Sequence, residues 1–456
     1  MNLMNSIRLA ALSALVLSGC SGDPIPTTSG RADGGGGGGA SNADAGATQV
    51  DAGETGVDAG DAPGCAPIGT PLAMGAAPSQ RGDMAYAYDP KCQRMYLFSG
   101  DEGVPMRCSA AGSIFIDDMW VYDLTTRIWS QLTPTGANKP LPRARSVGSW
   151  DAARERFIVF GGRWRSASSG PYTFLNDLWA YDPATNEWTE LSGLNAVGGP
   201  SGRMNSAMVS DAMGDRVIVH AGGTTDFLNF FVNNETWAFD LAAGGWSRIA
   251  MGGLQPPARL FHAMTLDTSR RRVYIFGGGG ETAFQGPFYD DMWYLDLAND
   301  TWTEIPKDPA FPDQRIKPKM DYDAVNDQIL LFGGHDLTDL GNTNQLFAFN
   351  VERGVWELKI LGDVLDAPAR AMCDFPGNFT EPDLQSPERR ESHLFAVTGS
   401  HAMLFGGRTD CGISNDTWHL DPGAYAWSQI NDSFTGMTCF RAGRSDCREP
   451  TSDMCN

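Results

Sequence analysis

The sequence predicts an all-β protein that folds as a six-bladed β-propeller with four antiparallel strands in each blade. The first observation is a unit that occurs six times and contains two aromatic residues nine positions apart. The pairs are Trp120 and Trp129, Trp179 and Trp188, Trp237 and Trp246, Trp293 and Trp302, Phe347 and Trp356, and Trp418 and Trp427. The second observation is an apolar run before each pair that ends in two small residues, as in Phe160-Gly161-Gly162. Repeats of this length are typical of propellers and solenoids, whose units bury a core only when packed side by side.

Each unit contains four short segments that are typical of β-strands. In the first unit these segments cover residues 84–88, 94–98, 119–122 and 128–132. They are rich in β-branched and aromatic residues, they are bounded by turn residues, and they are too short for helices. The fixed aromatic spacing leaves room only for a short turn between the third and fourth strands. We expect the paired tryptophans to form the core between blades, because each buries a large apolar area.

An arginine opens every unit and completes a pattern that resembles a known family. The six arginines are Arg81, Arg143, Arg203, Arg259, Arg315 and Arg390. Together with the run into Gly-Gly, the aromatic-Asp step and the later Trp, they resemble the kelch family of β-propellers over about residues 79 to 431. The resemblance implies four-stranded blades packed in a ring. Since the repeats begin with a first strand and end with a fourth, we expect no blade to be shared between the two ends of the repeat region.

The two ends of the chain differ from the repeats in composition. Arg8 and the apolar run that follows predict a secretory signal peptide over residues 1–19. Leu17-Ser18-Gly19-Cys20 resembles the bacterial lipobox, which implies a lipid on Cys20 and an extracytoplasmic, lipid-anchored protein at the outer membrane or cell surface of a Gram-negative bacterium. The alternative is an ordinary signal peptide with a chance cysteine. Residues 20–64 are rich in Gly, Asp and Ala and predict a disordered tether, and residues 432–456 form a cysteine-rich tail.

Charge and cysteine content exclude some classes of function. The formal net charge of −21 argues against nucleic acid as a partner, because such binding needs a basic surface. After the N-terminus no apolar run is long enough to span a membrane, so a lipid anchor is the one membrane attachment we expect. With Cys20 lipidated, eight cysteines remain, which fits disulfides in an oxidising compartment.

One disulfide can be predicted from the expected fold. Cys373 lies before the first strand of the last unit and Cys411 lies between its second and third strands. Because these connections emerge on the same face of a propeller, we expect a Cys373–Cys411 bond. We expect the tail to attach to the ring near Cys65. A zinc site is the alternative, but the tail cysteines lack the close Cys-x-x-Cys pairs of zinc ribbons, and we expect no metal.

Two sets of residues are candidates for a site at the face where these connections emerge. The first set is the six opening arginines, which could form an anion-binding ring or could instead be held by acids of neighbouring blades and by carbonyl groups. The second set interrupts the repeat directly after the small pairs and could form a specific site or simply solvated loops. Its members include Arg163, Arg165, Glu281, His335, Asp336, Arg408 and Asp410.

The sequence favours a binding module over an enzyme. It contains no nucleophile elbow, phosphate loop or helical zinc motif, and we expect no cofactor. The expected partner is an unidentified protein or an acidic glycan. The alternative is an enzyme that modifies a sugar acid, similar to the six-bladed sialic acid epimerase. In such an enzyme Glu281 would be the acid/base group, and arginines at the mouth of the central channel, on the face described above, would hold the substrate. The copper-radical galactose oxidases resemble the fold but carry a separate C-terminal domain that is missing here.

Overall fold

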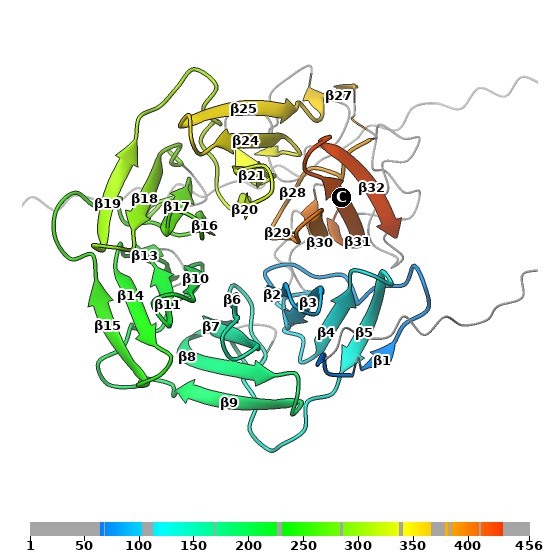
Figure 1. Cartoon of the computed structure of the whole chain (residues 1–456), viewed down its shortest axis with the longest axis vertical. Coiled ribbons are helices and arrows are strands. Elements are labelled where there is room, and N and C mark those ends of the chain that lie inside the picture. Colours follow the sequence, from blue (N-terminus) through cyan, green and yellow to red (C-terminus); the bar gives the residue numbers. More distant parts are fainter. Residues whose placement is uncertain are drawn as a thin grey trace, which may run out of the picture. The chain divides into compact units, whose positions relative to one another are not determined.

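A computed structural model gives the fold of the chain. It describes residues 64–67, 69–102, 113–167, 170–225, 230–282, 286–336, 341–365, 379–381, 383, 385–409 and 412–431. All of these residues belong to one compact unit, Asp61–Met454. In this unit six antiparallel sheets are arranged in a ring (Figure 1). The predicted all-β, six-bladed propeller with four antiparallel strands per blade is confirmed.

The strands of each blade follow one another in the chain from the innermost to the outermost. Blade 1 contains β2 (Ala85–Asp89), β3 (Arg94–Phe98), β4 (Met119–Asp123) and β5 (Ile128–Leu132); blade 2 contains β6 (Val147–Asp151), β7 (Arg156–Trp164), β8 (Thr173–Asp182) and β9 (Glu187–Ser192). Blade 3 contains β10 (Ala207–Asp211), β11 (Arg216–His220), β14 (Thr236–Asp240) and β15 (Gly245–Ile249); blade 4 contains β16 (Ala263–Asp267), β17 (Arg272–Phe276), β18 (Met292–Asp296) and β19 (Thr301–Ile305). Blade 5 contains β20 (Lys319–Asp323), β21 (Gln328–Phe332), β24 (Leu346–Asn350) and β25 (Val355–Ile360); blade 6 contains β28 (Arg390–Glu391), β29 (Leu394–Val397), β30 (Ala402–Thr409), β31 (Gly412–Asp421) and β32 (Ala426–Asn431).

Several strands lie outside the predicted four per blade. A short strand, β1 (Thr70–Pro71), pairs with β5 and adds a fifth strand to the outer edge of blade 1. Three small hairpins project from the blades: β12 (Gly223–Thr225) with β13 (Phe230–Val232), β22 (His335–Asp336) with β23 (Gly341–Asn342), and β26 (Val364–Leu365) with β27 (Phe379–Glu381). The second and fourth segments predicted for blade 1 match β3 and β5, whereas the first is one residue early.

The small pairs do not always end a strand. In blades 2 and 6 the second strand passes through the Gly pair and continues as a hairpin with the third strand. The register shifts between Phe160 and Gly162 and between Phe405 and Gly407, so each pair forms a bulge. The residues that follow, Arg163 and Arg408, therefore lie in extended strands above the ring rather than in irregular loops.

The second glycine of each pair is required by close packing within its own blade, and its N–H bonds to the next blade. Gly162 has φ +100°, and a Cβ there would lie 2.8 Å from the carbonyl oxygen of Ala144. Its N–H donates to the carbonyl oxygen of Arg203 in the next blade, at 2.9 Å. The equivalent bond from Gly407 to Arg81, also 2.9 Å, joins blade 6 to blade 1. A side chain at these positions would collide with the segment that opens the same blade, Ala144 and Ser146 at Gly162 and Glu391 and His393 at Gly407.

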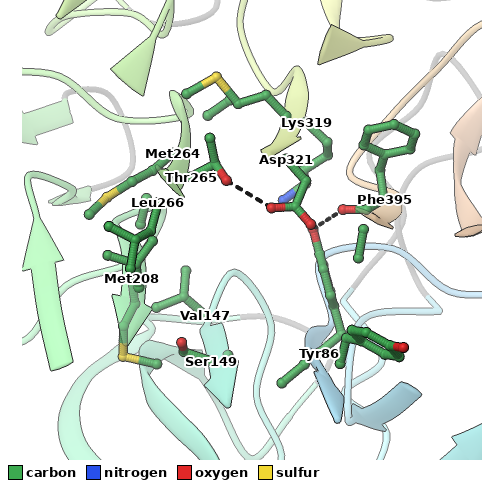
Figure 2. Close-up of a pocket in the computed structure, with 18 of the residues that line it drawn as sticks. Tyr86, Val147, Ser149, Met208, Met264, Thr265, Leu266, Lys319, Asp321 and Phe395 are labelled. Carbon is green, nitrogen blue, oxygen red and sulfur yellow. Dashed lines mark hydrogen bonds between the residues drawn. The ribbon is translucent and has the colours of Figure 1, made fainter. Parts of the chain in front are cut away.

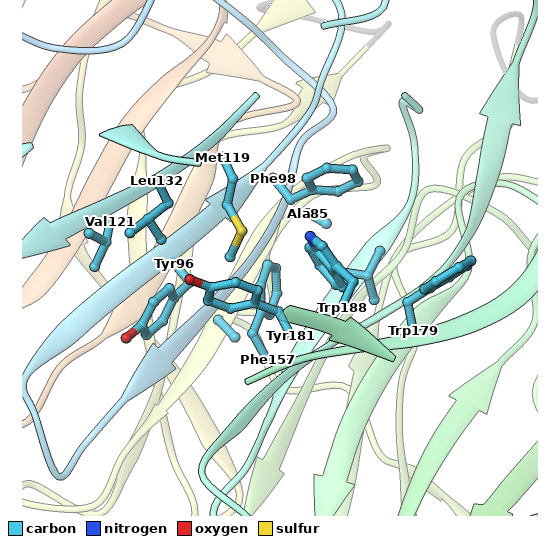
Figure 3. Close-up of a cluster of buried hydrophobic side chains, with 12 residues drawn as sticks. Ala85, Tyr96, Phe98, Met119, Val121, Leu132, Phe157, Trp179, Tyr181 and Trp188 are labelled. Atoms are coloured by element: carbon cyan, nitrogen blue, oxygen red, sulfur yellow. The ribbon is translucent and has the colours of Figure 1, made fainter. Parts of the chain in front are cut away.

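The tryptophan of each fourth strand forms the core between blades, as expected. Each packs against the aromatic residue just before the small pair of the preceding blade. The pairs and their ring-centre separations are Trp188 with Phe98 (5.1 Å), Trp246 with Phe160 (5.4 Å), Trp302 with His220 (4.8 Å), Trp356 with Phe276 (5.8 Å), Trp427 with Phe332 (5.0 Å) and Trp129 with Phe405 (4.8 Å). Figure 3 shows the core between blades 1 and 2, where Trp188 lies beside Phe98 and Phe157.

The ring closes between blade 6 and blade 1 without a shared strand, as the sequence predicts. Trp129 is 1% exposed, and its indole N–H donates to Thr417 Oγ1 at 3.2 Å. Tyr122 Oη lies 3.1 Å from His419 Nε2 across the same boundary. Asn415 Nδ2 donates to the carbonyl oxygen of Pro78 at 2.9 Å. Hydrophobic packing and side-chain hydrogen bonds therefore take the place of a covalent closure.

One disulfide lies among the described residues, between Cys65 and Cys92. It joins the segment before β1 to the turn between β2 and β3. Because Cys65 is bonded to Cys92, the tail cysteines do not bond to it, and the expected attachment of the tail near Cys65 stays a prediction. The predicted partners Cys373 and Cys411 lie outside the described residues, as do Cys20, the tether before residue 64 and the tail.

Within the described part of the chain, no helix has the length and hydropathy needed to cross a membrane.

Candidate functional site

The six opening arginines are buried inside the blades. Each is at most 1% exposed. In blade 6, Arg390 Nη1 and Nη2 donate to the two carboxylate oxygens of Asp416 at 2.7 and 2.8 Å, while Nη1 also donates to the carbonyl oxygen of Gly406 and Nε to that of Glu388. The equivalent acceptors are Asp118, Asp177, Glu235, Asp291 and, in blade 5, Gln345.

The acceptor of each arginine precedes the first aromatic residue of its blade by two positions. In five blades that aromatic residue is tryptophan, and its indole N–H donates to the same acid, as Trp418 does to Asp416 at 2.7 Å. In blade 5 both partners change together, to Gln345 and Phe347. This Asp-x-Trp signal was present in the sequence but was not used in the prediction.

The arginines therefore act within their own blades. Their guanidinium groups are engaged by carboxylates and carbonyl groups, which supports the alternative that they stabilise the propeller instead of forming an anion-binding ring. The acids belong to the same blade, so the expectation of neighbouring-blade acids is wrong on that point. Bidentate pairing of this kind holds a side chain in one geometry.

A second ring of residues lies two positions after these arginines and narrows the centre of the propeller. Its members, which we call the constriction ring, are Asp83, Arg145, Asn205, Phe261, Lys317 and Ser392. All six have positive φ values, between 54° and 65°. Hydrogen bonds between backbone groups join neighbouring members, with an N–H of one blade donating to a carbonyl oxygen of the blade before it. The donor and acceptor residues are Asp83 and Ser392, Arg145 and Asp83, Asn205 and Arg145, Phe261 and Asn205, and Lys317 and Phe261. The backbone is constant around the ring while the side chains differ, as expected of a site built on a repeat.

Ion pairs surround the constriction ring on the side of the hairpins. The mouth cluster, as we call this group, consists of Asp83, Asp101, Arg145, Arg163, Lys317, Glu391 and Arg408. Its ion pairs are Arg145 Nε to Asp83 Oδ2 (3.3 Å), Lys317 Nζ to Glu391 Oε1 (2.9 Å), Arg408 Nη1 to Glu391 Oε1 (3.4 Å) and Arg163 Nη2 to Asp101 Oδ2 (3.7 Å). Four cations and three anions thus meet at the centre of this face, although the whole chain is strongly acidic.

Burial and neighbouring charges set the protonation states of the mouth cluster. Burial alone would raise the pKa of Glu391, but Lys317 and Arg408 outweigh it and lower that pKa to about 2. The same balance applies to Asp83, because Lys317, Arg145 and Arg163 hold the pKa of its carboxyl group below the usual range in spite of burial. Burial, with help from Arg145, lowers the pKa of Arg163 to about 10. Glu391, Asp83 and Arg163 are therefore charged at neutral pH, whereas burial raises the pKa of the third acid, Asp101.

The structure brings several predicted site residues to this cluster. Arg163 and Arg165 both lie over the ring of Tyr172, with guanidinium carbons 4.2 and 4.3 Å from its centre. His335 is buried, and its Nδ1 lies 3.1 Å from Asn342 Oδ1 across the β22–β23 hairpin. Asp336, also buried, partly offsets the effect of burial on the pKa of Arg315, which is lowered to about 10.

Of the remaining predicted residues, Glu281 does not join the cluster. Glu281 is exposed in a turn of blade 4, and no hydrogen bond or ion pair among the described residues connects it to the mouth cluster. The structure therefore does not place it against the mouth arginines as the sugar-acid alternative requires. Asp410 lies outside the described residues. Also within that described portion, no group of three or more His, Cys, Asp or Glu side chains is arranged to hold a metal ion.

None of the constriction ring, and not Glu391 either, was predicted from the sequence. A signal existed, because the residue two positions after each repeated arginine varies from Asp to Phe to Lys while its neighbours repeat. Glu391 directly follows Arg390 on β28, where successive side chains point to opposite sides. Arg390 therefore reaches Asp416 inside the blade, while Glu391 reaches Lys317 at the mouth.

Comparison with known proteins identifies the family. A family model described as the KLHDC2/KLHL20/DRC7 Kelch-repeats domain matches residues 68–278, 192–371 and 273–445. The chain is also 29% identical over 231 residues to the flagellar outer-arm dynein alpha chain of Chlamydomonas reinhardtii, which covers 47% of this chain and 5% of the dynein. It is 26% identical over 258 residues to an N-(sulfonatooxy)prop-2-enimidothioate sulfolyase of Thlaspi arvense (53% of this chain, 71% of the sulfolyase).

A further relative is mouse kelch domain-containing protein 1, 24% identical over 208 residues, with 44% of this chain and 48% of that protein covered. The chain thus spans less than half of two of these three relatives. The repeated Arg, Gly-Gly and Trp positions, the six-bladed ring and the matching family model lead to one conclusion: the chain belongs to the kelch-repeat family of β-propellers.

Proposed function

We propose that this propeller is a protein-binding module that holds its partner on the face where the hairpins and the connections between blades emerge. The partner contacts the rim of this face through apolar side chains and places an acidic group at the mouth cluster. The observation that carries the proposal is that exposed apolar residues and a cation-rich centre occur together on one face.

The apolar residues are unevenly distributed. Of twelve large apolar side chains exposed in the described part of the chain, eight lie in hairpins or connections of this face. They are Ile114, Leu141, Leu194, Val197, Phe231, Met251, Leu254 and Leu361. Phe231 is 56% exposed at the β12–β13 hairpin, and Val197 is fully exposed in the connection from blade 2 to blade 3. Apolar residues around a polar centre are typical of a surface that binds another protein.

The centre of the face provides selectivity for an acidic group. The mouth cluster contains one more cation than anion, and the Arg163 and Arg165 guanidinium groups lie together over Tyr172. Guanidinium groups bind carboxylates in a bidentate manner. A buried cationic centre also strengthens an electrostatic contact, because the effective dielectric constant is lower than in water.

The test is a selection of phage-displayed peptides against the full chain, followed by affinity measurements. We expect the selected peptides to combine acidic and apolar residues. Replacing Arg163, Arg165 and Arg408 together by Gln should weaken their binding by about 2 kcal/mol or more, which is roughly 30-fold. Arg353→Gln, an exposed substitution in the turn between β24 and β25 on the opposite face, is the matched control and should leave the affinity unchanged.

Two results would contradict this proposal. Unchanged peptide affinity in the triple variant would exclude the mouth cluster as the site. A thermal stabilisation by sialic or uronic acids, with no peptide enrichment, would instead identify an acidic glycan as the ligand.

We also propose that Cys20 carries a lipid and anchors the propeller outside the cytoplasm, at the outer membrane or cell surface of a Gram-negative bacterium. The lipobox-like sequence supports this, and the Cys65–Cys92 bond is of the kind formed in oxidising compartments. In a Gram-negative host fed a labelled fatty acid, the full chain should incorporate label and sediment with membranes, whereas the Cys20→Ala variant should do neither. Equal labelling of both proteins would exclude this anchor.

A further inference from the structure

The centre of the propeller contains a chamber that the proposed function does not use. It has a volume of about 350 Å³ and is lined by the inner strands of all six blades. Figure 2 shows Lys319, Asp321 and Tyr86 on one side, and Met208, Met264, Leu266 and Val147 opposite. This volume lies at the lower end of the range of small-molecule sites.

The chamber is separated from the mouth by the constriction ring. At the ring the space falls to about 50 Å³, because six hydrogen-bonded backbones approach the axis and carry Phe261, Arg145 and Lys317. At the other end the lining includes Thr268, which is exposed in the turn after β16. A small molecule therefore enters from the face opposite the mouth.

Lys319 lines this chamber, and burial lowers the pKa of its ammonium group although Asp83 partly offsets the effect. No hydrogen bond or ion pair joins its Nζ to any described residue, and the contact that it makes is with the ring of Tyr86, whose centre lies 5.7 Å away. Asp321, two residues along β20, does not neutralise it. The Asp321 carboxylate accepts hydrogen bonds from Thr265 Oγ1 (2.8 Å), Val397 N (2.8 Å) and Tyr322 N (2.9 Å).

Neutral polar groups close to the ring also lack partners. Ser146 Oγ and both ring nitrogens of His262 are buried, and none of these three atoms has a hydrogen-bond partner among the described residues. Both residues line the chamber and are 7% exposed. Burial and Arg259 lower the pKa of His262 to about 3, so its imidazole is neutral at pH 7 and can both donate and accept a hydrogen bond. Because these atoms are buried, they face the packing between blades and not the open chamber; His262 lies against His220, with ring centres 5.4 Å apart. They therefore do not contribute to a site in the chamber.

The residues that line the chamber indicate which kind of ligand it binds. Asp321 is satisfied by three hydrogen bonds whereas Lys319 has none, so the ligand carries one negative group that pairs with Lys319. The opposite wall of Met208, Met264 and Leu266 suits an apolar body, and methionine side chains adapt readily to different shapes.

We propose that the chamber is a binding site for a small organic carboxylate, which enters from the face opposite the mouth, pairs with Lys319, and packs its apolar body against Met208 and Met264. This site is independent of the protein-binding face. It would give one propeller two ligands, a macromolecule on one face and a metabolite-sized acid in the channel.

The test compares benzoate and hexanoate with their uncharged amides, using calorimetry on the full chain. We expect the acids to bind and the amides to bind at least tenfold more weakly, because only the acids offer a charge to Lys319. Lys319→Met keeps the length of the side chain and removes its charge, and it should lower the affinity for benzoate about 30-fold. Lys307→Met, an exposed surface substitution, is the matched control.

Chemical footprinting of the protein without substitutions gives a second test, which does not depend on whether a variant folds. Benzoate should protect Lys319 from acetylation, measured by mass spectrometry, and leave Lys307 reactive. Ser210→Trp, at the far end of the chamber, should slow benzoate association. Equal binding of acid and amide, undiminished binding in Lys319→Met, an unprotected Lys319, or no binding of either acid would each overturn the proposal.

Discussion

Replacing Arg390 by Met lowers the free energy of unfolding by about 3–5 kcal/mol. Arg390 is fully buried and pairs through both terminal nitrogens with Asp416. Without it the Asp416 carboxylate keeps the Ser414 hydroxyl and the Trp418 indole as donors but loses its counter-charge inside the blade. Chemical denaturation followed by tryptophan fluorescence measures this loss.

Blade 5 provides a matched control for this prediction. Arg315 occupies the equivalent position and is just as buried, but its side-chain acceptor is the neutral Gln345, at 3.0 Å. Arg315→Met leaves an unpaired amide instead of a buried charge, so the expected loss is smaller, about 1–3 kcal/mol. Adding Asp416→Asn to the Arg390 variant should recover part of its stability. If the two arginine variants lose equal stability, the carboxylate is not the cause.

Trp129→Ala removes the main packing contact at the boundary between blades 6 and 1. Trp129 lies 4.8 Å from Phe405 and 5.1 Å from Tyr122 between ring centres, and we expect its loss to cost about 3–5 kcal/mol. Among the described residues no peptide connection crosses this boundary, so the effect should also be local. Hydrogen exchange should become faster in the strands of blades 1 and 6 before the other blades respond.

Trp356 is the control for the effect of position. It is similarly buried, at 2% exposed, but it lies between blades 4 and 5, which follow each other in the chain. Trp356→Ala should cost a similar free energy without opening the boundary between blades 6 and 1. The same exchange pattern in both variants would show that this boundary is no weaker than the others.

The repeat made the scaffold predictable, while the site depends on positions that depart from it. The tryptophan spacing and the Gly pairs indicate strands and their packing because the same backbone contacts recur in every blade. The bulges that extend β7 and β30 above the ring depend on pairing between strands, which one sequence does not reveal. Lys317 and Glu391 lie 74 residues apart and meet only because the ring brings the start of blade 5 beside the start of blade 6.

The opening arginines show that residue type alone does not predict a binding site. Six recurrent arginines suggest anion binding, and their chemistry would allow it. The acids that hold them are two residues before the first aromatic residue of each blade, and the change to both Gln345 and Phe347 in blade 5 shows that the three positions form one unit. Charge at the mouth comes instead from positions that differ between blades, such as Asp83, Arg145 and Lys317.

The Cys65–Cys92 bond also determines how mechanical tension reaches the ring. A pull on the chain before Cys65 passes through the disulfide to Cys92, in the turn between β2 and β3. β1 lies inside the covalent loop between the two cysteines and carries none of that tension, so it is not peeled from the edge of blade 1. The turn at Cys92 is on the face opposite the mouth. Tension between an anchored N-terminus and a partner held at the mouth would therefore run across the thickness of the propeller, along its strands, the direction in which sheet hydrogen bonds resist together.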